Sequence, residues 1–426
     1  MSHLSLPLFL VCGCLIAISA QATEPDDAAL DLADRAPDVP QQASNWHLFA
    51  EGALGSDKLR DGRTQSNHRL SLDLQYDAAF APGWRAVLAD RLDASWPPTN
   101  ALTNEHAINT IKEAYLSWQA QANTLLDLGR INVRNGVAVG YNPTDYFRAQ
   151  ALRSSVSVDP NSLKINRQGS VMLRGQKLWN SGSITAIVSP RLANQASDSG
   201  FNPNLGATNH ENRWLIAVSQ KFNDRLNPQF LLYKPASLPA QLGFNLSGLV
   251  NDATVAYVEW SGGRSPSLLA QALDQQGIAH TDDNAFRNRL ATGLTFTTAN
   301  KISLTMEVQY NGGAQDNDSW TAMRNNPTPV LGLYSNWLQQ AQEPVTRWRT
   351  FTHLFWQDAL INHLDLSALI YNNLADHSRL TWMEARYHWD RTELALQWQR
   401  YTGQTFTEFG ATPQVWNWQV VLRQYF

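Results

Sequence analysis

Apolar and polar side chains alternate along long stretches of the chain with a period of two. Between Arg69 and Phe80 nearly every second residue is Leu, Tyr, Ala or Phe, and most of the residues between them are polar or charged. The alternation recurs in Lys301 to Tyr310, Thr392 to Tyr401 and Gln414 to Phe426. It predicts β-strands with one apolar and one polar face. We count about eighteen such strands of roughly ten residues, a length that crosses a bilayer at a tilt.

The connections between these strands fall into two alternating classes. One class is short and turn-like, as in Ala81-Pro82-Gly83 and Asn180-Ser181-Gly182. The other is mostly long and covers residues 95–109, 135–166, 191–210, 261–284 and 311–344. A barrel with short turns at one end and long loops at the other predicts this alternation, whereas a β-sandwich does not.

A large aromatic residue ends almost every strand that precedes a short turn. Eight of nine such strands end this way; the exception ends near Val250. Trp and Tyr are favoured at a lipid interface, so these residues predict an aromatic girdle. Its members are Phe80, Trp118, Trp179, Phe222, Phe296, Trp356 and Trp389, with Phe426 at the end of the chain. The sequence thus predicts an all-β, transmembrane, antiparallel up-and-down β-barrel. The barrel must be closed, because lipid offers no hydrogen-bond partners to the backbone of an edge strand.

The last strand, Gln414 to Phe426, carries Trp416 and Trp418 on one face and ends on Phe426. Alone it could be the terminal strand of a β-sandwich. It resembles the closing strand of Gram-negative outer-membrane barrels, in which the terminal Phe is the signal for the assembly machinery. The size and strand number look like the eighteen-stranded porin-like channels, a group that includes substrate-selective porins and alginate-export barrels. The resemblance implies a Gram-negative outer membrane and contact with the bilayer and lipopolysaccharide.

Composition narrows the alternatives. The 426 residues carry a net charge of -4, which gives no reason to expect nucleic acid. Mean hydropathy is -0.35, and no run of about 18 apolar residues occurs outside the amino terminus, so a helical membrane protein is excluded. Cysteine occurs only at Cys12 and Cys14. We therefore expect no disulfide, thiolate metal site or cysteine nucleophile in the mature chain, and we predict no metal and no cofactor.

Three segments are expected along the chain. Residues 1–22 have the character of a signal peptide, with Ala20-Gln21-Ala22 as a small-residue cleavage site. The stretch from Val11 to Cys14 faintly resembles a lipoprotein box. Residues 23–44, rich in Asp, are predicted to be a flexible periplasmic segment. Residues 45–426 form the predicted barrel.

Charged residues lie on the polar phase of the strands and are predicted to line the pore. They could form a basic track that draws anionic or hydroxyl-rich solutes. Alternatively, they could form a wall of Arg–carboxylate pairs that fixes the barrel's shape. Arg423, Glu113, Asp365 and Glu393 share this phase. The predicted pore-lining residues are Arg85, Arg91, Arg130, Arg134, Arg174, Arg213, Arg287, Arg289, Arg347, Arg349, Arg386, Asp73, Glu259, Glu307 and Glu384.

The stretch from Gly129 to Arg148 opens what we count as the third external loop. In porins this loop folds inward and narrows the channel, so by resemblance the stretch is a candidate constriction. The alternative is plain turn chemistry, in which Asn-Pro and Asp stabilise a tight loop. The candidate constriction residues are Gly136, Gly140, Asn142, Pro143 and Asp145.

We predict an outer-membrane channel for passive passage, general or selective, of small polar or anionic solutes. One alternative is an export channel for an anionic polysaccharide or other secreted product, working with periplasmic partners through residues 23–44. Another is a barrel enzyme or an adhesin. No G-x-S-x-G or H-E-x-x-H signature occurs, so no catalytic residue is predicted. His363 and Asp365 are predicted to share a hydrogen bond in the lumen.

Overall fold

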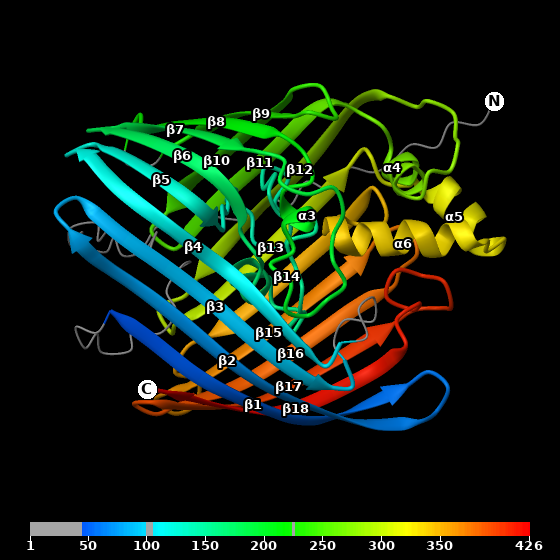
Figure 1. Cartoon of the computed structure of the whole chain (residues 1–426). Helices are drawn as coiled ribbons and strands as arrows, with labels where there is room; N and C mark the ends of the chain where they lie inside the picture. Colours follow the sequence, from blue (N-terminus) through cyan, green and yellow to red (C-terminus); the bar gives the residue numbers. More distant parts are fainter. Residues whose placement is uncertain (1–44, 99–104, 224–225) are drawn as a thin grey trace. The chain divides into compact units, whose positions relative to one another are not determined.

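The chain forms a closed barrel of eighteen antiparallel strands (Figure 1). The computed structural model describes residues 45–98, 105–223 and 226–426. The predicted signal peptide (1–22) and acidic segment (23–44) lie outside these residues. So do residues 99–104 and 224–225, which belong to two of the predicted connections.

Successive strands pair in chain order, and the last strand pairs with the first. β18 (Gln414–Tyr425) lies against β1 (Trp46–Leu59), from Phe49 opposite Tyr425 onward. Because every strand has two neighbours, the backbone is satisfied without water, as lipid requires. The predicted barrel of about eighteen strands is confirmed. The other strands are β2 (Thr64–Ala81), β3 (Trp84–Trp96), β4 (Ala107–Gln121), β5 (Thr124–Ile131), β6 (Ser170–Trp179), β7 (Gly182–Ser189), β8 (Arg213–Gln220), β9 (Gln229–Pro235), β10 (Gln241–Asn251), β11 (Thr254–Ser265), β12 (Ala285–Thr297), β13 (Ile302–Asn311), β14 (Trp348–Trp356), β15 (Leu364–Asn373), β16 (Arg379–His388) and β17 (Thr392–Thr402).

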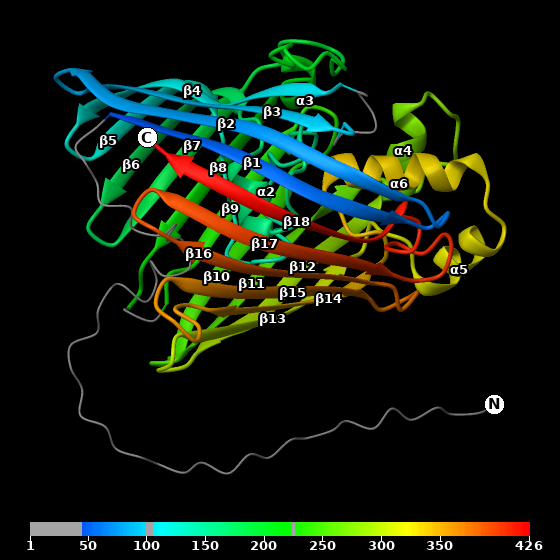
Figure 2. The same ribbon diagram turned by 90° about the horizontal axis from the view of Figure 1, so that it is seen from below.

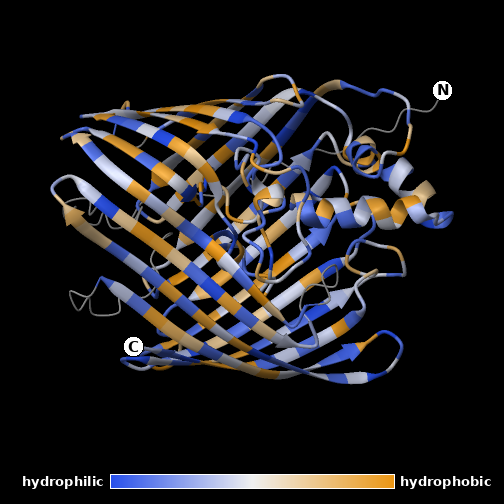
Figure 3. Cartoon of the chain, in the orientation of Figure 1, coloured by the Kyte–Doolittle hydropathy of each residue, from blue (hydrophilic) through white to orange (hydrophobic). Residues whose placement is uncertain are grey.

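The strands turn their apolar side chains outward. In β2, Leu70 is 62% exposed, while its neighbours Arg69 and Ser71 are buried inside. A soluble sheet would do the reverse, because water favours polar side chains on its outside. Figure 3 shows the resulting bands, in which orange and blue alternate along each strand. An apolar exterior around a closed sheet is the architecture of outer-membrane proteins.

The long connections gather at one end of the barrel and carry short helices, seen in Figures 1 and 2. Those of the last two long connections share an apolar cluster that includes Leu268, Trp320, Tyr334 and Leu338. Period-two alternation along the sequence does not indicate these helices. No helix in the described part of the chain is long and apolar enough to cross a membrane. The helices are α2 (Pro160–Ile165), α3 (Leu205–Thr208), α4 (Leu268–Gln275), α5 (Asn317–Asn325) and α6 (Pro329–Ala341).

The predicted alternation of long and short connections holds with three exceptions. The connection between β1 and β2 is only residues 60–63, that between β9 and β10 only 236–240, and that between β15 and β16 only 374–378. All three lie at the end where the long loops gather. In addition, β11 continues to Ser265, four residues beyond the expected start of its loop at 261, because its ladder with β12 extends that far.

The predicted girdle residues lie at the opposite end, beside the short turns. Trp118 stacks on Trp84 with ring centroids 5.6 Å apart, and Phe80 and Trp389 are more than half exposed. Phe222 lies just beyond β8 rather than at its last position. Trp179 and Phe296 are exposed, Trp356 is half-buried, and the terminal Phe426 is exposed. Contact of these residues with a lipid interface remains a prediction.

Candidate pore and constriction

The connection between β5 and β6 (residues 132–169, here the inner loop) crosses the interior to the far wall. Its first anchor is Glu259 of β11, six strands around the barrel from β5. The Glu259 carboxylate is 0% exposed. It accepts hydrogen bonds from the backbone N–H groups of Val137, Ala138 and Thr144 at 2.9, 3.0 and 2.8 Å. The side chain of Asn142 donates to the same carboxylate at 3.0 Å.

Glu307 of β13 is the second anchor. Its carboxylate accepts from the backbone N–H groups of Val139 at 2.9 Å and Gly140 at 3.2 Å. The hydroxyl of Tyr257 donates to the same oxygen at 2.8 Å, and that of Tyr371 donates to the Gly140 carbonyl at 3.1 Å. Glu259 and Glu307 together thus hold this stretch through five of its backbone N–H groups.

Two glycines allow the loop to approach the wall so closely. A Cβ on Gly140 would lie 2.6 Å from the ring of Phe351. A Cβ on Gly136 would lie 2.5 Å from the Glu259 carboxylate, and its φ of +107° favours glycine as well. Within the same stretch, Asp145 forms a buried ion pair with Arg167 at 2.6 Å. Pro143 is also buried.

A third carboxylate, Glu343 in the connection between β13 and β14, holds the next part of the inner loop. Arg148 forms a buried ion pair with it, the hydroxyl of Tyr141 donates to it at 2.6 Å, and Arg289 lies 3.8 Å away. Burial alone would raise the pKa of Glu343, but the two guanidinium groups outweigh burial and hold the pKa below its usual value. This contact therefore persists at neutral pH and is lost only on acidification.

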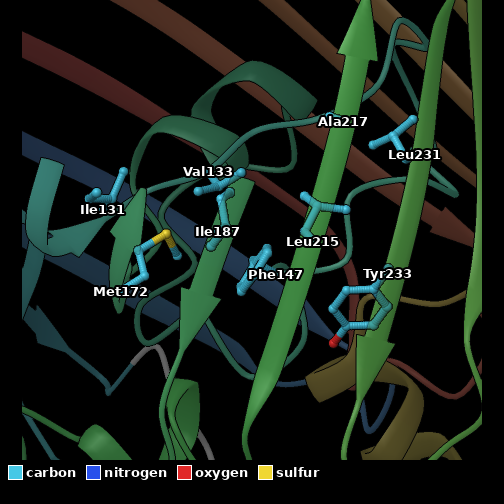
Figure 4. Packing of buried hydrophobic residues seen from close by; sticks show 9 residues of the cluster. All are labelled: Ile131, Val133, Phe147, Met172, Ile187, Leu215, Ala217, Leu231 and Tyr233. Carbon is cyan, nitrogen blue, oxygen red and sulfur yellow. The ribbon is translucent and has the colours of Figure 1, made fainter. Parts of the chain in front are cut away.

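The near wall holds the inner loop by apolar packing (Figure 4). The ring of Tyr146 stacks on Tyr233 of β9, with centroids 4.4 Å apart. Val133 and Phe147 of the loop pack among strand residues in one buried cluster. The inner loop thus reaches from β5–β9 to β11–β13 and occupies part of the interior. The remaining members of the cluster are Ile131, Met172, Ile187, Leu215, Ala217, Leu231 and Tyr233.

The remaining wall carries a continuous network of charged side chains, here the ionic band. It passes across the junction of the first and last strands, where Arg423 of β18 lies 2.7 Å from Glu51 of β1. Glu51 also pairs with Arg69 and, at 3.4 Å, with Arg91. On the other side, Arg423 lies 3.3 Å from Glu393 of β17. The ionic band comprises Glu51, Arg69, Asp73, Arg91, Asp93, Lys112, Glu384, Arg386, Glu393 and Arg423.

Most of the predicted pore-lining arginines have a carboxylate partner. Their pairs are Arg85–Asp77, Arg91–Asp93, Arg174–Asp127, Arg287–Asp283, Arg289–Glu343, Arg347–Asp316, Arg349–Glu408 and Arg386–Glu384. The four predicted carboxylates have partners as well. Glu259 and Glu307 accept the hydrogen bonds described above, Asp73 pairs with Lys112, and Glu384 pairs with Arg386. This arrangement is the one expected of a wall of ion pairs that fixes the barrel's shape.

The other three predicted pore-lining arginines form no ion pair with a carboxylate among the described residues. Arg130 donates to the carbonyls of Gly169 at 2.9 Å and Pro203 at 2.7 Å, and Arg213 donates to the carbonyl of Thr208. Carbonyl oxygens satisfy a guanidinium without cancelling its charge. Arg134 of the inner loop is exposed and makes no hydrogen bond or ion pair within the described residues, although it is near enough to Glu113 for electrostatic interaction.

The predicted bond between His363 and Asp365 is wrong. His363 precedes β15 and lies in the turn at φ +69°, so its side chain does not follow the period of the strand. Asp365 instead contacts His388 of β16 at 3.1 Å and accepts from the backbone N–H of Asp358 at 3.0 Å. Glu343 was not predicted as a functional residue, because it lies in a loop, where no strand periodicity marks it.

Comparison with solved structures places the fold. The chain is similar to OccAB1 of Acinetobacter baumannii, with a TM-score of 0.55, 12% identity, and coverage of 90% of this chain and 96% of that one. It is similar to OpdL of Pseudomonas aeruginosa, with a TM-score of 0.56, 11% identity, and coverage of 90% and 98%. The fold is that of the OprD/Occ outer-membrane channels. No protein-family model matches the chain, and no curated protein matches its sequence.

Replacing Glu51 with Ala should destabilise the barrel strongly. Arg69, Arg91 and Arg423 would lose a buried shared partner, and breaking a buried ion pair costs about 3–5 kcal/mol. Equilibrium unfolding in denaturant, with the protein in micelles, measures the loss. The matched control is Asp77→Ala, which breaks a pair with Arg85 whose side chains are 52% and 43% exposed. The control should cost at most about 1 kcal/mol; equal losses would contradict a special role for the junction.

Replacing Glu259 with Leu should release the inner loop from the far wall. Several backbone N–H groups would lose their acceptor, at about 1–3 kcal/mol for each one that stays buried. Amide hydrogen exchange of residues 137–144 should then be faster by about tenfold or more. Ser261→Ala is the control, because it removes one bond between the same strand and the loop, at Tyr146. Unchanged exchange in Glu259→Leu would show that the near wall alone holds the loop.

Proposed function

We propose that this protein is a channel in the outer membrane of a Gram-negative bacterium, for passive, selective passage of small polar or anionic solutes. A closed barrel with an apolar exterior suits the outer membrane. Eighteen strands enclose an interior too wide for the wall's own side chains to fill. The structural neighbours are channels rather than enzymes, at low sequence identity.

The observation that carries this proposal is the inner loop held between two walls. Its hydrogen bonds to Glu259 and Glu307 fix it inside the barrel. A solute would therefore pass beside the stretch containing Gly136, Gly140 and Asn142, and this stretch would be the constriction. A loop held by buried carboxylates suits a constriction of fixed width, because several hydrogen bonds must break before the loop moves.

The expected preference for anions rests on charges that lack a carboxylate partner. The ionic band is nearly self-compensating, with five basic and five acidic members, so it gives little net field. Arg134 is exposed on the inner loop, and Arg130 and Arg213 are bound by carbonyls. These charges would raise the local concentration of anions in the pore.

The partners proposed for this function are the bilayer, lipopolysaccharide and the outer-membrane assembly machinery. The exposed terminal Phe426 lies beside the end of β18, where its backbone N–H donates to the carbonyl of Leu48 in β1. The last residue is thus still part of the junction between first and last strands. This position suits a terminal signal that is read while the barrel closes.

Arg134→Glu should shift ion selectivity toward cations without abolishing conductance. A unit charge several ångströms from an ion changes its energy by roughly 0.5–1 kcal/mol in water. The permeability ratio of anions to cations should therefore fall by about threefold or more. Single-channel reversal potentials in a planar bilayer with a salt gradient measure this ratio.

The control is Arg63→Glu, because Arg63 lies in the exposed turn between β1 and β2, paired with Asp61. It should leave the permeability ratio near the wild-type value. An unchanged ratio in Arg134→Glu, with normal conductance, would contradict the role of this residue. A folded wild-type barrel that gives no current steps would contradict the channel itself.

A further inference from the structure

A pocket of about 570 Å³ lies on the outside of the barrel, at the loop end of β17 and β18. Side chains on the outward phase dominate its lining: Leu396 and Arg400 are exposed, and Trp418 is 40% exposed. The pocket belongs neither to the interior nor to the ionic band. It is lined by Leu396, Gln397, Trp398, Arg400, Trp416 and Trp418.

Strand register arranges these residues in layers. Trp416 of β18 lies opposite Lys58 of β1 on one side and Arg400 of β17 on the other. The next outward layer, farther from the loops, pairs Trp418 with Trp398. Because adjacent strands are about 4.8 Å apart, the backbones of Lys58 and Arg400 are about 10 Å apart. Two cations thus flank a tryptophan at the rim, above a second pair of tryptophans.

The rim cations have few acidic neighbours on this face. Arg400 makes no hydrogen bond or ion pair with any residue that the structure describes. Lys58 donates to the carbonyl of Gly62 in its own turn. Asp61, near Lys58, is paired with Arg63 at 2.6 Å, and Asp57 is buried on the inward face. Both rim cations can therefore accept an external anion.

An anionic lipid headgroup fits this arrangement of charge. Basic residues on the lipid face of a barrel are costly at the midplane and tolerated near the interface, where tryptophans also prefer to lie. An unpaired arginine above three tryptophans therefore faces headgroups rather than acyl chains. A second barrel at this face is disfavoured, because a two-fold contact through the pocket would bring two copies of Arg400 together.

We propose that this pocket binds a phosphorylated glycolipid of the outer leaflet, of the lipid A type. Arg400 and Lys58 hold a headgroup phosphate, and Trp416 packs against the sugar between them. Trp398, Trp418 and Leu396 contact the first part of an acyl chain. The inference rests on the proposed outer-membrane location, with the long loops outward, and does not depend on passage of solutes.

Native mass spectrometry of the barrel, refolded without glycolipid and titrated with diphosphorylated lipid A, tests the site. The wild type should retain one lipid A per barrel. The double variant Lys58→Gln/Arg400→Gln should bind about tenfold more weakly, as expected for loss of charge-assisted contacts at an exposed site. Arg400→Lys should retain most of the affinity, and lipid A without phosphate should bind the wild type as weakly as the double variant does.

The matched control is Arg264→Gln, because Arg264 is also exposed and outward at the loop end of a strand, β11, and donates to a backbone carbonyl. It should bind lipid A like the wild type. Equal affinity in the double variant would overturn the proposal, and so would an equal loss in Arg264→Gln, which would indicate diffuse attraction. Equal retention of phosphatidylglycerol, or dimers that exclude lipid A, would also overturn it.

Conductance of the same refolded samples separates the two proposals. Lipid A retention with no current steps would leave the pocket intact and reject the channel. Current steps with no retention by a folded wild type would reject the pocket alone. Folding of each variant is checked by its β-sheet circular dichroism before titration.

Discussion

Closure of the sheet between the first and last strands is the constraint on which the rest of the structure depends. In lipid each strand needs two neighbours, so β1 must meet β18 although they are separated by most of the chain. Backbone pairing alone would tolerate a shifted register. The contact of Glu51 with Arg423, 372 residues apart in sequence, adds a side-chain restraint at this junction. A shift of one strand by one residue against the other would leave Glu51 and Arg423 on opposite faces, so that one of the two charges would face lipid without a partner, which is costly.

The barrel's buried carboxylates have two different structural roles. Those of the ionic band are paired with arginine or lysine and stabilise the wall. Glu259 and Glu307 instead accept hydrogen bonds mainly from the backbone of the inner loop. A backbone N–H can be supplied by almost any residue, so this contact specifies the path of the loop rather than its side chains. The exposed Arg134 is consequently free for another role, since the loop does not need it for anchoring.

Period-two alternation was sufficient to predict the strands, their outward faces and the closed barrel, because each face meets one solvent. The alternation does not identify which side chains contact one another. Arg349 meets Glu408, 59 residues away, and His388 rather than His363 meets Asp365, since both contacts depend on register and on turns. The helices α4 to α6 were missed because their burial depends on one another and not on the barrel wall. The resemblance to porins pointed to the inner loop, but nothing in the sequence identified Glu259 as its acceptor.

Exceptions to the alternation carry as much information as the rule. On the outward phase of β17, Leu394, Leu396 and Trp398 are followed by Arg400, so apolar character ends within one outward position. On β1 the outward phase passes from Leu54 through Ser56 to Lys58. Because these strands are neighbours of β18, both transitions occur at the same register position, beside Trp416. The loss of apolar character on neighbouring strands is expected where they leave the apolar layer of a membrane, and it marks that boundary on the side of the barrel formed by β17, β18 and β1.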